Sequence, residues 1–334
     1  MQKTISIIIA IFNRKDELFE LLNSLIAQTD KNFEVIIVDD GSSVDLLPTV
    51  ETFKEMLEIQ YFKKTNSGPG LSRNYGAKRA KNDWLVFVDS DVIVEKDYIE
   101  NIKKNLESTD CAAFGGADKA HKGFNILQKA ISYSMTSVFT TGGIRGSKKA
   151  VTKFQPRSFN MGVNKEIFLK IGGFSEMRIG EDPDLSMTIW ENGYQTAFFD
   201  NIGVYHKRRT DLGKFSKQVY QFGCARPILN QRHPHYVKPT FWFPTLFLLG
   251  YVAGFLEYFI LHKGLVLACY GIYTGLIFLH SLYITRNFAI AFQAIITTYV
   301  QMFSYGYGFL ESWVKLNILR MKPEEAFPKH FHQK

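Results

Sequence analysis

Short apolar runs alternate with helical patterns over residues 1–116 of the 334-residue chain. Four apolar runs have the length of buried strands, and they lie at residues 5–12, 33–38, 59–62 and 84–88. Leucines at helical spacing predict a helix after the first run (Leu18, Leu21, Leu22 and Leu25), and a second helix is expected at residues 71–80. This alternation is typical of βαβ units, so the sequence predicts an α/β fold with a mainly parallel sheet.

Each predicted strand leads into a cluster of polar residues or glycines. In chain order, the clusters are Asn13-Arg14, Asp39-Asp40-Gly41-Ser42, Asn66-Ser67-Gly68-Pro69-Gly70 and Asp89-Ser90-Asp91. In an open α/β sheet, ligands bind beyond the carboxyl ends of the strands. We therefore expect the four clusters to meet at one edge of the sheet and to form a ligand site.

The two clusters rich in aspartate have both a functional and a structural interpretation. Alternation at a strand end lets Asp89 and Asp91 project to the same side, where their hard oxygens suit Mg²⁺ or Mn²⁺ bridged to a diphosphate. Asp39 or Asp40 could accept a hydrogen bond from a base or a ribose. Solvated turns use the same residue types, so neither cluster decides the function by itself.

The glycine-rich cluster before the second predicted helix has features of an anion site. Its glycines permit close approach of a backbone, and the N-terminus of the following helix favours anions. Arg73, in the same helix, could reach a diphosphate. As an isolated string the cluster is ambiguous.

Three almost uncharged runs occupy residues 241–261, 265–285 and 288–310, and each is about one bilayer long as a helix. A basic band precedes them, because residues 201–240 contain eight Lys or Arg against one acid, Asp211. This order follows the positive-inside bias and places the preceding domain in the cytoplasm. One alternative is a buried helical bundle in a soluble protein. Another is two crossings or a re-entrant arrangement, since three full crossings would carry the basic tail to the far side.

The charge and the cysteines narrow the picture further. The net charge of +8 lies mostly in the basic band beside the apolar runs, so no nucleic-acid partner is expected. The three cysteines are far apart and lack the spacing of a metal site or a redox pair, which fits a reducing compartment. The sequence therefore predicts a protein of the inner (cytoplasmic) membrane whose main domain faces the cytoplasm.

Seven motifs, taken in order, resemble those of the family 2 glycosyltransferases of the GT-A fold. They are Ile11-Phe12-Asn13-Arg14, Asp39-Asp40-Gly41-Ser42, Gly68-Pro69-Gly70-Leu71-Ser72-Arg73-Asn74, Asp89-Ser90-Asp91, Asn160-Met161-Gly162, Gly172-Gly173-Phe174 and Gly180-Glu181-Asp182-Pro183-Asp184-Leu185. The resemblance implies a Rossmann-like GT-A domain at residues 1–232, with a nucleotide-sugar-binding half (1–116) and an acceptor half (117–232). A membrane-associated helical region (233–334) would follow it.

The resemblance also implies roles for individual residues. Nucleotide-sugar binding would fall to residues of the strand-end clusters: Ile11, Asn13, Asp39, Asp40, Gly70, Arg73, Asp89 and Ser90. Asp91 would ligate Mn²⁺ or Mg²⁺ and His206 would be a further ligand, although a surface histidine beside a basic run is an equal alternative. Asp182 would be the catalytic base, with Glu181 as its main competitor. The structural interpretation of both acids is a helix N-terminus.

The implied activity is inverting transfer of one sugar from a nucleotide-diphosphate sugar, with UDP-sugars as the first candidates, to an acceptor hydroxyl. The chain lacks the Gln-x-x-Arg-Trp motif of processive polysaccharide synthases, which favours transfer of single sugars. The acceptor would be a lipid-linked or cell-surface glycan precursor in polysaccharide biosynthesis. The basic loop at residues 141–157 could receive a phosphate-linked lipid, although solvated loops have the same composition.

Two other functional classes compete with this interpretation. A catalytically idle nucleotide-sugar-binding scaffold is disfavoured by the joint presence of Asp89, Asp91 and Asp182, because a scaffold could lose any of them cheaply. A metal-dependent nucleotidyltransferase would more naturally carry a glycine-rich loop directly after the first strand, and the residues there contain no glycine.

Overall fold

The computed structural model describes residues 3–119, 124–141, 153–206 and 211–332. Its contacts divide the chain into two compact units. The first comprises Met1–Lys119, Lys148–Lys207 and Phe331–Lys334 and is called the sheet unit below. The second comprises Ala120–Ser147 and Arg208–His330 and is called the helical unit.

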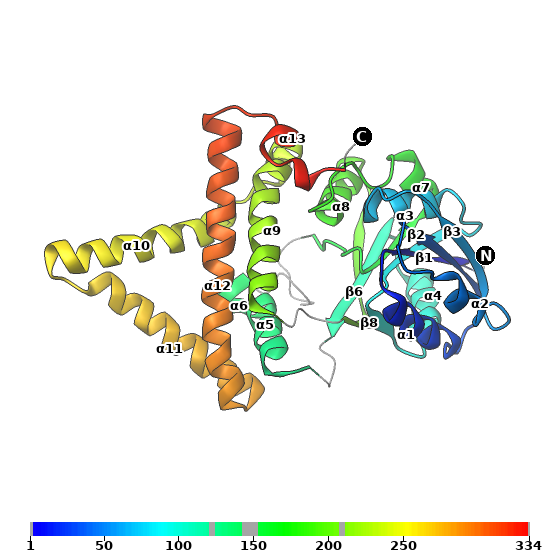
Figure 1. Cartoon of the computed structure of the whole chain (residues 1–334), viewed down its shortest axis with the longest axis horizontal. Helices are drawn as coiled ribbons and strands as arrows, with labels where there is room; N and C mark the ends of the chain where they lie inside the picture. The colour runs from blue at the N-terminus through cyan, green and yellow to red at the C-terminus, as the bar shows by residue number, and fades with distance from the viewer. Residues whose placement is uncertain (1–2, 120–123, 142–152, 207–210, 333–334) are drawn as a thin grey trace. The chain divides into compact units, whose positions relative to one another are not determined.

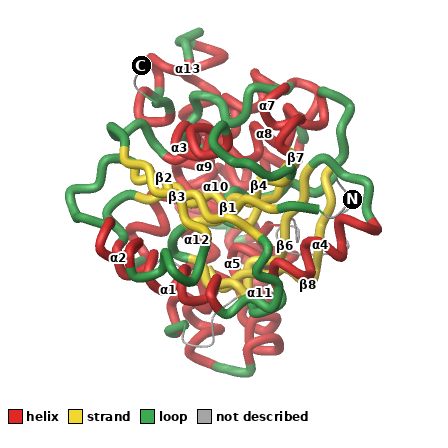
Figure 2. The backbone as a smooth tube through the Cα atoms, turned by 90° about the vertical axis from the view of Figure 1, so that its right-hand side faces the viewer, coloured by secondary structure: helices red, strands yellow, loops and turns green. Residues whose placement is uncertain are grey.

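Within its described residues, the sheet unit contains an eight-stranded sheet of order β3-β2-β1-β4-β7-β6-β8-β5 (Figure 2). The strands are β1 (Ile5–Ile11), β2 (Phe33–Asp39), β3 (Glu58–Lys63), β4 (Trp84–Asp89), β5 (Val92–Val94), β6 (Ala113–Lys119), β7 (Asn160–Asn164) and β8 (Thr196–His206). The first four strands are parallel to one another, whereas β7 is antiparallel to both of its neighbours. The expectation of a mainly parallel α/β sheet in the first part of the chain is confirmed, and each predicted strand is found within one or two residues of its predicted bounds.

Helices cover both faces of this sheet. In Figure 2, α3 (Pro69–Ala77), α7 (Lys165–Lys170) and α8 (Glu181–Glu191) lie above it, and α1 (Lys15–Ile26) and α2 (Leu47–Glu51) lie below it. Residues of α4 (Tyr98–Ser108) pack in the same core as those of α1 and α2. Strands covered on both faces need largely apolar sequences, and β1 and β2 are apolar except for Ser6, Glu34 and the terminal Asp39. The buried Ser6 hydroxyl donates a hydrogen bond to the Glu34 carboxylate. The predicted leucines of α1 pack in the core against alternate isoleucines of β1.

The strand register brings the carboxyl ends of the parallel strands level with one another. Asp39 of β2 pairs with Ile11 of β1 and with Lys63 of β3, and Asp89 of β4 pairs with Ala10 of β1. The polar clusters that follow these strands therefore meet at one edge of the sheet, as the sequence predicts.

The helical unit contains the three apolar runs as helices: α10 (Phe243–Leu261), α11 (Leu265–Thr285) and α12 (Phe288–Trp313). Its other elements are α5 (Ile126–Thr136), α6 (Val138–Thr141), α9 (Leu212–Arg232), η1 (Pro234–Tyr236), η2 (Pro239–Trp242), η3 (Val314–Ile318), α13 (Pro323–Ala326) and η4 (Pro328–His330). In Figure 1, α9 and α12 lie side by side, whereas α10 and α11 project from them and meet at their connector.

Among the described residues, three helices are long and apolar enough to cross a membrane, and they correspond to the three predicted runs. Only 17% and 11% of the most apolar windows of the first two are buried in the protein, against 39% for the third. A packed soluble bundle would bury the apolar faces of all three helices. Exposed apolar surface on α10 and α11 is what lipid contact requires.

The third apolar helix, α12, packs closely on α9. At Gly223 of α9, a Cβ atom would lie 2.3 Å from the carbonyl oxygen of Tyr305, and at Gly308 of α12 it would lie 2.4 Å from that of Tyr220. The Ser312 hydroxyl donates a hydrogen bond to the Cys224 carbonyl oxygen at 2.8 Å. Small residues at such crossings let backbones approach each other.

The two compact units do not coincide with the predicted domains, whose boundary lies at residue 232. The contacts place α9, together with α5, in the same unit as the apolar helices, although both lie in the predicted acceptor half (117–232). The face of α9 that contains Gly223 is buried against α12. The functional division at residue 232 stays a prediction.

Candidate active site

Asp39 and Asp40 are buried where β2 ends, and their carboxylates organise the neighbouring loops. Asp39 accepts hydrogen bonds from the Ser42 N–H and the Tyr61 hydroxyl, both at 2.8 Å. Asp40 accepts the N–H groups of Ser67 and Gly68, at 2.8 and 2.7 Å. Asp40 therefore holds the glycine-rich loop before α3 against the end of β2.

Lys64 adds a cation to this edge of the sheet. Its Nζ atom lies 2.5 Å from a carboxylate oxygen of Asp40 and 2.5 Å from the Ser67 hydroxyl oxygen. It also donates to the Thr65 carbonyl oxygen at 2.9 Å. The sequence interpretation missed Lys64 because it began the third cluster at Asn66, yet Lys64 directly follows β3, as the other cluster residues follow their strands.

Ile11 and Asn13 fasten the end of β1 to the loop after β2. The carbonyl oxygen of buried Ile11 accepts the Asp40 N–H at 2.8 Å. Asn13 adopts a left-handed conformation with φ +54°, which asparagine tolerates better than most residues. Its side-chain oxygen accepts hydrogen bonds from the Ser43 N–H and hydroxyl, at 2.8 and 3.0 Å. Both residues therefore shape the site from its backbone side.

Arg73 is the buried centre of the cluster. Its side chain extends from α3 and forms one ion pair with Asp89, at 2.7 Å, and a second with Glu181. Its guanidinium lies 5.4 Å from the centre of the Phe174 ring. Burial lowers the pKa of Arg73, but the two carboxylates outweigh burial and raise it above the ordinary value. Arg73 is therefore a fixed positive charge.

The start of α8 approaches α3 closely, and Gly70 makes this approach possible. A Cβ atom at Gly70 would lie 2.8 Å from the Glu181 Oε2 atom and 3.3 Å from the Cβ atom of Phe174. Gly180, with φ +87°, turns the chain into α8 just before Glu181. Gly70 is thus a packing residue beneath the Arg73 ion pairs.

The two neighbouring carboxylates Glu181 and Asp182 lie in different environments. The Glu181 side chain is 8% exposed and paired with Arg73, whereas that of Asp182 is 20% exposed and lies 3.4 Å from a guanidinium nitrogen of Arg157. Burial raises the pKa of Glu181 to about 7, because it outweighs the opposing charge of Arg73 and is reinforced by Asp182. Glu181 thus belongs to the packed interior, and Asp182 lies nearer the solvent.

The Asp89-Ser90-Asp91 cluster joins the same edge. Ser90 is buried, the Asp89 side chain is 33% exposed, and Asp91 forms an ion pair with Arg14 from the first cluster. The backbone of His206, the last residue of β8, pairs with Val92, next to Asp91. The His206 side chain lies outside the described part of the structure. Among the described residues, no three His, Cys, Asp or Glu side chains are grouped as a metal site.

Most of the predicted basic loop at residues 141–157 also lies outside the described residues, as do Lys207, Arg208 and Arg209 of the basic band. Arg157 is described, and its ion pair with Asp182 connects the end of that loop to the start of α8. The sequence interpretation counted Arg157 as an acceptor-loop cation and missed this contact.

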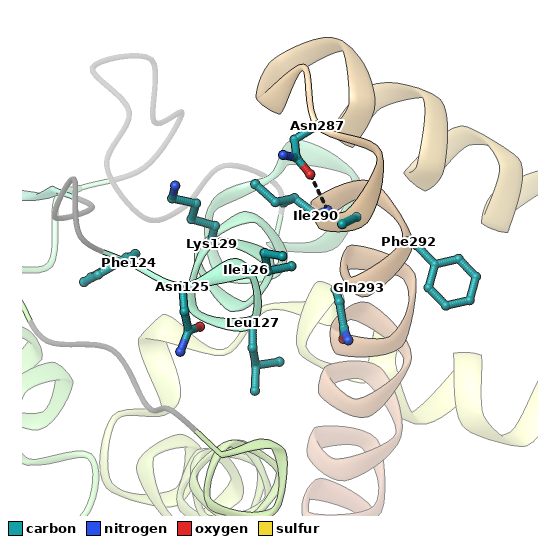
Figure 3. A pocket seen from close by; sticks show the side chains of 10 residues that line it. Phe124, Asn125, Ile126, Leu127, Lys129, Asn287, Ile290, Phe292 and Gln293 are labelled. Carbon is teal, nitrogen blue, oxygen red and sulfur yellow. Dashed lines mark hydrogen bonds between the residues drawn. The ribbon is translucent and has the colours of Figure 1, made fainter.

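The helical unit has an open hollow of its own, with a volume of about 650 Å³. Figure 3 shows that residues from the start of α5 and the start of α12 line it, including Ile126, Ile290 and Phe292. Lys129 supplies a cation to its rim, and Asn287 caps α12 by accepting the Ile290 N–H at 3.1 Å. None of the predicted site residues lines this hollow.

Comparison with known proteins identifies the family. The chain matches the family model described as Glycosyl transferase family 2 over residues 6–171. An uncharacterized glycosyltransferase of Haemophilus influenzae is 32% identical over 246 residues, which are 70% of this chain and 77% of that protein. The chain belongs to glycosyl transferase family 2.

Some other relatives of this family 2 glycosyltransferase are much longer than the chain. An uncharacterized glycosyltransferase of Rickettsia felis is 40% identical over 106 residues, or 32% of this chain, and the match spans 18% of that protein. Among solved structures, the mannosyltransferase PcManGT from Pyrobaculum calidifontis is similar with a TM-score of 0.57 and 17% identity, over 88% of this chain and 86% of that one. A likeness at this identity shows a shared fold, so the expected GT-A fold is confirmed.

Proposed function

We propose that this family 2 glycosyltransferase transfers one sugar, with inversion, from a nucleotide-diphosphate sugar to an acceptor hydroxyl. The observation that carries the proposal is the cluster in which Arg73 joins Asp89 to the start of α8 and leaves Asp182 as the more exposed acid. A screen of nucleotide sugars for release of nucleoside diphosphate tests it. UDP-sugars come first, and GDP-mannose follows because PcManGT is described in complex with GDP-Man.

The donor would bind along the strand-end clusters. Asp39, Asp40 and the backbone around Ile11 and Asn13 would form the nucleoside side, and Asp89 with Ser90 the ribose side. Arg73 would face the diphosphate. Among the described residues, the buried Arg73 Nε atom has no hydrogen-bond partner, so the site keeps a donor group available for an anion.

Asp182 would act as the catalytic base. An acceptor hydroxyl is a poor nucleophile until its proton is removed as the new glycosidic bond forms. The proton would pass to the Asp182 carboxylate while the hydroxyl oxygen attacks the anomeric carbon on the face opposite the leaving nucleoside diphosphate, which inverts that carbon. Glu181 is held by Arg73 in the packed interior, so it would position the site and would not touch the acceptor.

The residues at the end of β4 would bind a divalent cation. Pairing of β5 with β8 brings the backbone of His206 next to Asp91, and a carboxylate with an imidazole is a donor set that Mn²⁺ accepts. PcManGT is described in complex with Mn²⁺. Asp91 and His206 would hold Mn²⁺ or Mg²⁺, and the cation would supply positive charge against the charge developing on the leaving diphosphate.

Replacing Asp91 with Ala should remove the part of nucleoside diphosphate binding that depends on Mn²⁺. The ion pair with Arg14 is lost as well, but Arg14 is half-exposed and becomes solvated, so the melting temperature should change little. Calorimetry with UDP and GDP, each with Mn²⁺ and with a chelator, measures the effect. Asp97→Ala is the matched control, because Asp97 is exposed. Unchanged Mn²⁺ dependence in Asp91→Ala would rule out Asp91 as a ligand.

The apolar helices support a membrane location for the proposed reaction. We infer that the enzyme resides at the inner membrane with its sheet unit in the cytoplasm, because the basic band lies before the first apolar helix. The acceptor would be a lipid-linked or cell-surface glycan precursor of polysaccharide biosynthesis, which such a location gives access to.

Cysteine labelling tests the membrane placement of α11. Gly275→Cys is tolerable because a Cβ atom there meets nothing within 4 Å, and Lys263→Cys places the same group in the exposed connector between α10 and α11. In a background without Cys111, Cys224 and Cys269, a water-soluble maleimide should label Lys263→Cys in permeabilised membranes and should spare Gly275→Cys until the protein is denatured. Equal labelling of both variants would show that α11 is in water.

A further inference from the structure

The segment after the helical unit returns to the sheet unit and is held there. Phe331 is buried and forms an antiparallel bridge with Met177, in the loop before α8. The N–H of the next residue, His332, donates a hydrogen bond to the Glu176 carbonyl oxygen at 2.9 Å. Backbone pairing and burial of the Phe331 ring therefore fix the position of His332.

The His332 ring lies directly against Gly68. A Cβ atom at this glycine would lie 2.0 Å from the ring carbon Cε1 and 2.3 Å from Nδ1, so no other residue fits without moving the ring. Gly68 also has φ +89°. The N–H of the same glycine donates to Asp40, and Asp40 binds Lys64. The ring thus lies against a glycine that is held by Asp40, a residue that we assign to the nucleoside side of the donor site.

The His332 ring has an unused hydrogen-bonding atom and is uncharged at neutral pH. Among the described residues, its buried Nε2 atom has no hydrogen-bond partner, and a buried polar group in this state is unfavourable. Burial lowers the pKa of His332, and the cations of Arg178 and Lys64 outweigh the carboxylates of Asp40 and Glu176. A neutral imidazole offers one donor, one acceptor and a flat aromatic face.

We propose that His332 is a nucleoside-binding residue of the donor site, which contacts the base with its ring and forms a hydrogen bond through Nε2. The inference rests on the proposed nucleotide-sugar donor. A nucleoside fits this position better than a diphosphate does, because a neutral ring offers no positive charge to an anion. Arg73 supplies that charge elsewhere in the site. No sequence motif signals the role, since more than 260 residues separate Gly68 from His332.

His332→Ala in the full-length protein in detergent tests the inference. Calorimetry with Mn²⁺ measures the affinities of both proteins for UDP, GDP, dTDP and CDP. Any of these nucleotides that binds the wild type should bind the variant about fivefold to tenfold more weakly, which corresponds to roughly 1 kcal/mol. Affinity for inorganic pyrophosphate should stay the same, because it has no nucleoside. His332→Phe keeps an aromatic ring and loses Nε2, so its nucleotide affinity should lie between those of the wild type and His332→Ala. His235→Ala is the control, since His235 is exposed in the helical unit.

The possible outcomes separate the inference from the function beneath it. Unchanged nucleotide affinity in His332→Ala would overturn the inference alone, and an equal loss of pyrophosphate affinity would show a general effect on the loop. Tighter nucleotide binding would mean that His332 occludes the site, which also overturns it. A wild-type protein that binds none of the four nucleotides would overturn the proposed donor site, and the inference with it.

Discussion

Asp182→Asn should lower the rate of sugar transfer by about 10²-fold or more while donor affinity and melting temperature stay near those of the wild type. Asparagine preserves the size of the side chain and an oxygen at the start of α8, so a purely structural Asp182 would lose roughly 1 kcal/mol or less of stability. It cannot accept the acceptor's proton. The measurement is the initial transfer rate beside calorimetric donor affinity and thermal unfolding.

Glu181→Gln is the matched control for Asp182→Asn. It also replaces an acid by its amide, one residue away, but it weakens the ion pair that positions Arg73. We expect it to weaken donor binding and to leave the chemical step less affected than Asp182→Asn does. Near-normal turnover in Asp182→Asn together with lost turnover in Glu181→Gln would identify Glu181 as the base. Activity in both variants would refute general-base catalysis by this pair.

The convergence of the strand-end clusters could be predicted because it depends on local periodicity and a general rule of parallel sheets. Short apolar runs that alternate with helical patterns predicted the four strands. The register of these strands aligns Ile11, Asp39 and Asp89 at one edge of the sheet. The three apolar helices could be predicted for a similar reason, since length and composition alone define them. Both features are encoded within short segments.

The contacts that join distant segments could not be predicted in this way. Arg73 meets Glu181 across 108 residues, and His332 reaches Gly68 from the far end of the sequence. No periodic pattern in the sequence predicts such pairs, because each pair depends on how the loops fold over the edge of the sheet. The resemblance to the family drew attention to Arg73 and Glu181 separately, but it did not indicate that one neutralises the other. Likewise, the helical pattern of α9 did not reveal its packing partner.

Arg73→Met should both destabilise the protein and abolish donor binding. The substitution leaves Glu181 buried without its cation, and breaking a buried pair in this way costs about 3–5 kcal/mol. The pH dependence has a definite sign. Because burial raises the pKa of Glu181 from 4.5 to about 7, the stability that its protonated form contributes is complete below 4.5 and is lost as pH rises through 7. Removal of Arg73 raises that pKa further, so the variant should lose more stability at about pH 8 than at about pH 6.

The double variant Arg73→Met with Glu181→Met separates stability from binding. Replacing a whole buried ion pair with apolar side chains is often neutral or stabilising, and Asp89 is exposed enough to be solvated alone. We therefore expect thermal unfolding of the double variant to return close to that of the wild type, with little dependence on pH from this site. Calorimetry should still detect no nucleoside diphosphate binding, because the cation that faces the diphosphate is missing. A double variant that binds nucleotide normally would show that Arg73 serves only the fold, and one that stays as unstable as Arg73→Met would show that the cost does not arise from the uncompensated charge of Glu181.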